Sequence, residues 1–111
     1  MYLLLLMLLA PVELRGQYTC HGKTPQGQYD VVILIEKKDD AYQLTWITNE
    51  VKAKGIGVRN GDVLAAFFVN PKNEGGVVLF RITKGGLEGI WSMGSGKVYA
   101  ETCTLAPASR S

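Results

Sequence analysis

The chain has few of the residues that enzymes use for catalysis. Its 111 residues include one histidine, His21, and two cysteines, Cys20 and Cys103. A general base or an activated nucleophile needs a positioned partner. His21 and Cys20 are adjacent, and adjacent side chains point to opposite faces of a strand. We therefore expect no enzyme active site, and we interpret His21 as a surface or rim residue.

Metal ligands are also scarce. One histidine, two cysteines and scattered carboxylates do not supply the ligand set of a zinc site. The pair Asp39-Asp40 lacks the spaced oxygens of a calcium loop, so it is interpreted as a solvated turn. We expect no metal and no other cofactor.

An excess of charge of one sign is missing as well. The net charge is only +2, which favours no particular charged partner. One set of lysines would form a basic patch if two strands ended side by side: Lys37, Lys38, Lys52 and Lys54. Neighbouring acidic residues dilute this set and no aromatic residues interleave with it, so we expect no nucleic-acid partner.

The chain has one long apolar run, over residues 1–10. This run is too short to cross a bilayer and lies where the apolar region of a signal peptide would be. We expect residues 1–16 to be a signal peptide cut near Gly16, residues 17–111 to be a single domain without a stable membrane span, and the protein to be periplasmic or secreted. A buried N-terminal helix is the alternative.

The two cysteines lie near the two ends of the mature chain. In an exported protein this placement predicts a Cys20–Cys103 disulfide that ties the first strand to the last. Closing so long a loop would stabilise the fold by about 4 kcal/mol. Two buried free thiols are the alternative.

Glycine, in contrast, is abundant, with 13 residues that indicate many turns. Asn60-Gly61 predicts a type I′ hairpin turn, and the apolar run over residues 63–69 is interpreted as buried. Elsewhere apolar residues alternate with polar ones, as in half-buried strands. The predicted strands are residues 17–21, 28–37, 42–48, 51–59, 62–69, 77–83, 87–91 and 97–105.

Short turns join these eight strands, and no segment of the mature chain has the period of a helix. The sequence therefore predicts an all-β fold, an eight-stranded antiparallel up-and-down meander closed into a small barrel. Closure would remove the edge strands that promote aggregation. An open two-sheet β-sandwich is the alternative. An eight-stranded barrel has room inside for side chains or for one small ligand.

Several short motifs resemble small exported bacterial proteins that are often labelled fibronectin-binding protein. These motifs are Tyr18-Thr19-Cys20-His21-Gly22, Gly27-Gln28-Tyr29, residues 55–65, Leu87-Glu88-Gly89-Ile90-Trp91-Ser92 and Glu101-Thr102. The resemblance spans most of residues 18–104 and implies an exported, compact β-barrel of avidin-like or lipocalin-like appearance. The opening Tyr18-Thr19-Cys20 is also similar to periplasmic inhibitors of C-type lysozyme.

Aromatic residues on predicted inward faces are the best candidates for a site: Tyr29, Tyr42, Trp46, Phe80 and Trp91. They would either fill the core or line a pocket at the barrel mouth. We take Tyr42, Trp46, Trp91 and Glu101 as candidate ligand-binding residues, because a buried Glu101 would need hydrogen-bond donors.

We therefore expect a non-catalytic binding module. One hypothesis is adhesion, the binding of a host-matrix or other extracellular protein through the surface and loops. The alternatives are capture of a small apolar ligand in the barrel mouth and inhibition of a periplasmic lysozyme.

Overall fold

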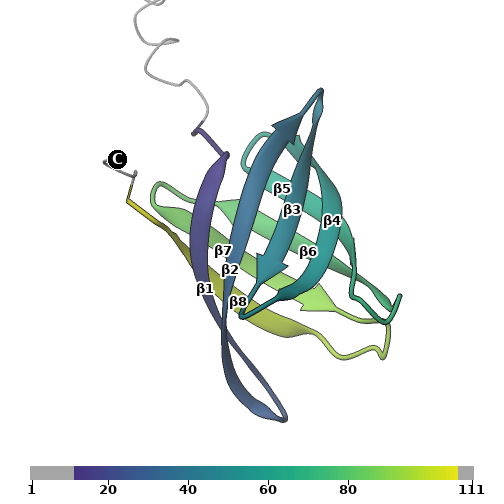
Figure 1. Ribbon diagram of the computed structural model, residues 1–111. Helices are drawn as coiled ribbons and strands as arrows, with labels where there is room; N and C mark the ends of the chain where they lie inside the picture. The colour runs from purple at the N-terminus through teal and green to yellow at the C-terminus, as the bar shows by residue number, and fades with distance from the viewer. Residues whose placement is uncertain (1–11, 108–111) are drawn as a thin grey trace, which may run out of the picture.

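The computed structural model describes residues 12–107 as a closed barrel of eight antiparallel strands (Figure 1). The strands are β1 (Gly16–Thr24), β2 (Gly27–Lys38), β3 (Ala41–Ile47), β4 (Val51–Asn60), β5 (Val63–Val69), β6 (Gly75–Ile82), β7 (Gly86–Ser92) and β8 (Tyr99–Leu105). Each strand pairs with the next, and β1 pairs with β8. The predicted barrel is confirmed, and the open sandwich is wrong.

The described residues contain no helix that is long and apolar enough to span a membrane. The predicted signal peptide lies largely outside the described residues and stays a prediction.

The core is formed by alternate side chains of the strands. Along β2, the side chains of Val31, Ile33 and Ile35 are buried and those between them are more exposed. Strand β6 buries Val78, Phe80 and Ile82 in the same way. Because successive side chains of a strand point to opposite faces, each strand contributes one face to a shared interior.

A disulfide fastens the closing pair of strands. Cys20 on β1 lies directly opposite Cys103 on β8 in the ladder, and their sulfurs are bonded. The predicted disulfide is confirmed, and free thiols are wrong. A disulfide is typical of an oxidising, non-cytoplasmic compartment.

The hairpin between β4 and β5 differs from the predicted type I′ turn. Asn60 pairs with Val63, so the two turn residues are Gly61 and Asp62. Gly61 has a positive φ of 64°, whereas Asn60 and Asp62 do not have positive φ. Glycine at the first turn position is typical of a type II′ turn. The prediction of type I′ was wrong because Asn60 is still part of the ladder.

The sequence predicted that the whole run over residues 63–69 is buried, but only alternate residues of this run are buried. Phe68 is buried, whereas the adjacent Phe67 is 52% exposed. The run follows the same alternation as the other strands, but its outward positions are also apolar. Because the exposed residues of β5 are also apolar, the alternation between buried and exposed positions cannot be recognised from hydrophobicity alone.

The barrel is packed at the end where β1 begins. Leu14 has 0% exposure, and its carbonyl oxygen accepts a hydrogen bond of 2.7 Å from the Tyr18 hydroxyl. The Arg59 Nη1 atom donates to the carbonyl oxygen of Val12 at 2.6 Å. These contacts hold the segment before β1 against the barrel and place Leu14 in the core.

Candidate ligand-binding site

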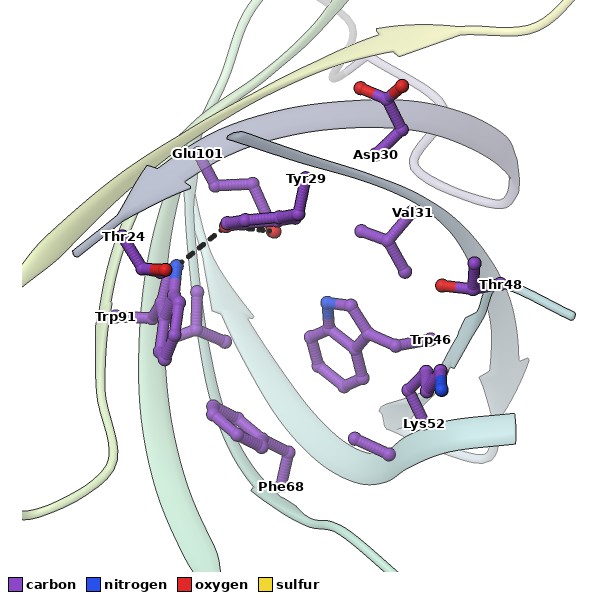
Figure 2. A pocket seen from close by; sticks show the side chains of 12 residues that line it. Thr24, Tyr29, Asp30, Val31, Trp46, Thr48, Lys52, Phe68, Trp91 and Glu101 are labelled. Atoms are coloured by element: carbon purple, nitrogen blue, oxygen red, sulfur yellow. Dashed lines mark hydrogen bonds between the residues drawn. The ribbon is translucent and has the colours of Figure 1, made fainter. Parts of the chain in front are cut away.

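An open cavity of about 310 Å³ lies inside the barrel, toward the end that carries the β1–β2 and β3–β4 turns (Figure 2). Its lining residues are Thr24, Tyr29, Asp30, Val31, Trp46, Thr48, Lys52, Ala53, Phe68, Val78, Trp91 and Glu101. The volume is at the lower end of the range for small-molecule sites, and the lining is mostly apolar, as is usual for them.

Aromatic rings form much of the cavity wall. The ring centroids of Trp46 and Phe68 lie 5.2 Å apart, and those of Phe68 and Trp91 lie 6.4 Å apart. Tyr29 meets Trp91 edge to face at 6.3 Å. These separations are typical of attractive aromatic pairs. The rings hold one another in place and leave an apolar space between them.

A directed chain of hydrogen bonds crosses this wall. The Trp91 Nε1–H donates to the Tyr29 hydroxyl oxygen at 2.9 Å, and the Tyr29 hydroxyl donates to Glu101 Oε1 at 2.9 Å. An indole N–H can only donate, so the Tyr29 oxygen accepts from Trp91 and its proton is left for Glu101. The series of hydrogen bonds from Trp91 through Tyr29 therefore ends on the Glu101 carboxyl group.

The strand register brings Tyr29 to Glu101. Gly22 on β1 pairs with Tyr29 on one side and with Glu101 on the other. A β-carbon at Gly22 would overlap the Tyr29 ring. Because Gly22 has no side chain, the ring can cross β1 and its hydroxyl can reach a strand beyond its immediate neighbour.

Glu101 is 4% exposed, and burial raises the pKa of its carboxyl group above the ordinary 4.5. Hydrogen bonding by the Tyr29 hydroxyl and the Trp46 indole N–H lowers this pKa, but to a smaller extent. In Figure 2 the Trp46 indole nitrogen lies on the side of the ring that faces Glu101. The burial of Tyr29, followed by the charge of Glu101, raises the pKa of the Tyr29 hydroxyl.

The second carboxyl oxygen of Glu101 has spare capacity to accept a hydrogen bond. Oε2 lies 4.0 Å from Cys103 Sγ, but this sulfur is bonded to Cys20 and has no hydrogen to donate. Among residues 12–107, the only N–H or O–H group that donates to the carboxyl group within 3.5 Å is the Tyr29 hydroxyl, and the Trp46 indole N–H interacts with it more weakly. Glu101 lines the cavity, so its carboxyl group is a buried acceptor in the cavity wall.

Glu101 and the two cysteines also bring three metal-ligating residue types together, with ligand atoms within 4.8 Å of one another. The two sulfurs are bonded to each other, so this cluster offers no thiolate to a metal. The single histidine is on the outer wall, where His21 Nδ1 lies 2.5 Å from Asp30 Oδ1 and both side chains are exposed.

Three of the four predicted site residues line the cavity: Trp46, Trp91 and Glu101. Tyr42 does not. It lies four residues before Trp46 on β3, about 13 Å away along the strand. There it pairs with Lys37, whose Nζ lies 4.7 Å from the Tyr42 ring centroid. Alternation predicts which side chains point inward, but it does not say at which end of the barrel they lie.

Phe68 is the aromatic lining residue that sequence reasoning missed. Its inward position was hidden in the continuous apolar run of β5. Pairing this strand with the next would have revealed the position, because Phe68 lies opposite Gly76 and a β-carbon there would overlap its ring.

In comparisons with known proteins, no family model, curated protein or solved structure matches the chain. The resemblance to exported proteins labelled fibronectin-binding therefore stays a prediction.

Proposed function

We propose that the protein is a non-catalytic binding module that captures a small, largely apolar molecule in the barrel cavity. The observation that supports this most strongly is the open cavity of about 310 Å³ walled by Trp46, Phe68 and Trp91, with Glu101 buried in its lining. Rings held by one another and by hydrogen bonds form a site before the ligand arrives. A ligand then pays little for ordering the site.

The two tryptophans provide the experiment. They are the only tryptophans in the chain, and both line the cavity. Titration with 2-phenylethanol should change the intrinsic fluorescence saturably, with micromolar to submillimolar affinity for a ligand of this size.

A matched pair of variants localises the binding. Ala53 lines the cavity and Ala65 is on the outer wall. Ala53→Phe should fill the space and abolish the fluorescence change, whereas Ala65→Phe should leave it intact. Equal binding by both variants would contradict capture in the cavity.

Adhesion to an extracellular protein is the second candidate, supported by an ordered and exposed loop after β5. Asn70 Oδ1 accepts hydrogen bonds from the backbone N–H groups of Lys72 and Glu74, and Asn70 Nδ2 donates to Glu74 Oε1. A loop with a fixed shape binds a partner at a lower entropic cost.

Asn70→Ala should weaken retention on immobilised fibronectin if this loop binds it. No retention of the wild type at micromolar concentration would contradict adhesion to fibronectin. Inhibition of a lysozyme stays a prediction.

A further inference from the structure

We infer that the ligand carries a primary amine, and that its ammonium group hydrogen-bonds to the Glu101 carboxyl group while its apolar part lies among the rings. This inference rests on the proposed function. The Glu101 carboxyl group lines the cavity, and among the described residues only its Oε1 atom accepts a hydrogen bond, from Tyr29. The Glu101 side chain is 4% exposed and lines the cavity, so the ligand meets it away from bulk water.

The hydrogen bonds around Glu101 favour a donor over an acceptor in the ligand. Trp91 donates to Tyr29 and Tyr29 donates to Glu101, so the protein has already used these donors. A carboxylate ligand would bring a second negative charge to a buried site and would be opposed. A hydroxyl ligand would donate a hydrogen bond to the Glu101 carboxylate without compensating its charge. An ammonium group does both.

The surroundings also suit a cation. The rings of Trp46, Phe68 and Trp91 border the cavity, and aromatic faces attract cations within about 6 Å. At the rim, the positive charge of Lys52 lies 3.6 Å from the negative charge of Glu50. The rim therefore carries charges of both signs, so a cation can enter without meeting a purely positive entrance.

Three probes of similar size test this inference: 2-phenylethylamine, 2-phenylethanol and 3-phenylpropionate. Calorimetric titration of the wild type should give at least tenfold tighter binding of the amine than of the alcohol, with the carboxylate weakest. In Glu101→Gln the amine and the alcohol should bind within about twofold of each other. Tyr29→Phe keeps the carboxyl group and should keep the preference for the amine. Circular dichroism confirms that each variant is folded.

The outcomes separate the two proposals. Equal binding of the amine and the alcohol to the wild type would overturn the ammonium site but leave capture in the cavity standing. An amine preference that survives in Glu101→Gln would also overturn it. If none of the three probes binds at millimolar concentration, both the ammonium site and the proposed function are contradicted.

A different observation concerns the outer wall. Large apolar side chains of β4 to β7 lie in two adjacent cross-strand rows: Ile56, Phe67 and Val77 in one, and Val58, Leu79 and Ile90 in the other, with Ala65 between Val58 and Leu79. The six large side chains are between 46% and 64% exposed, and neither row contains a charged residue. This outer apolar face borders a surface hollow of about 500 Å³.

We infer that the outer apolar face is the contact surface for a second copy of this chain. Each of the six side chains exposes on the order of 100 Å², so together they approach the largest apolar patches seen on monomers. Six such side chains supply most of the roughly 800 Å² per partner of a stable interface. In a two-fold symmetric dimer, the patch on one copy contacts the same patch on the other copy. An uncharged patch permits this contact, because no charged side chain is brought close to the same charged side chain of the partner.

Light scattering after size-exclusion chromatography tests this inference. The wild type should have the mass of a dimer at about 100 µM, and Leu79→Glu should be a folded monomer. Gln28→Glu adds the same charge on exposed β2 and should remain a dimer. A monomeric wild type would overturn the inference. It would also be overturned if the monomer used this face to bind phosphatidylcholine vesicles instead. A Leu79→Glu variant that still dimerises would overturn it too.

Discussion

The aromatic ring of Tyr29 lies across Gly22, at the place where a β-carbon would stand. Gly22 lies between Tyr29 and Glu101 in the ladder, so this crossing allows the hydroxyl of a β2 residue to bond a carboxyl group on β8. One glycine thus determines whether the hydrogen-bonded chain in the cavity wall can form.

Gly22→Ala should displace the Tyr29 ring and break its hydrogen bond to Glu101. We expect the free energy of unfolding to fall by about 1–3 kcal/mol, as for other overpacked positions, and ligand binding to weaken. Gly85→Ala is the control, because Gly85 has open space around it and no positive φ. Urea denaturation measures both variants. Equal stability of the two variants would show that the crossing imposes no steric requirement.

The stability of the protein should depend on pH through Glu101. Burial raises its pKa above 4.5, so the native state holds this proton more tightly than the unfolded chain does. The contribution is therefore fully present below pH 4.5 and is lost as the pH rises through the raised pKa. Relative to Glu101→Gln, the wild type should lose stability from pH 4.5 upward in urea denaturation series. A constant difference between them would contradict this.

Loss of the disulfide should cost about 4 kcal/mol, because it closes a loop between residues 83 positions apart. The variant Cys20→Ala/Cys103→Ala should therefore melt at a markedly lower temperature than the wild type. A reducing agent should lower the melting temperature of the wild type and leave that of the variant unchanged. A wild type insensitive to complete reduction would argue against this role.

Leu14 should contribute strongly to stability although it precedes the first strand. It has 0% exposure, so Leu14→Ala should cost about 2–5 kcal/mol, as for other buried leucines. Val12→Ala is the matched control, because Val12 is exposed and its side chain should matter little. Thermal unfolding distinguishes the two. A chain cut near Gly16 would lack Leu14 and should lose similar stability.

Much of the barrel was predictable because period-two burial is local. The alternation in β2 and β6, together with the turn residues, identified the eight strands, and Cys20 and Cys103 indicated which strands close the barrel. In β5 the outward residues are also apolar, so the signal vanished and Phe68 was missed.

The site was only partly predictable because it depends on register. Glu101 and Tyr29 are 72 positions apart, and their hydrogen bond requires β2, β1 and β8 to be aligned. Tyr42 was assigned to the site because it points inward like Trp46, but it lies farther along the barrel axis. Burial patterns give a side chain's direction, whereas position along the axis follows from the pairing of all eight strands.

The most direct test of capture in the cavity is a ¹H–¹⁵N spectrum of the indole N–H groups. Two such signals are expected, from Trp46 and Trp91, which both line the cavity. Both signals should shift saturably as 2-phenylethylamine is added to the wild type, and neither should shift in Ala53→Phe. Indole signals that stay in place at millimolar amine, or that move equally in Ala53→Phe, would contradict capture of this molecule in the barrel.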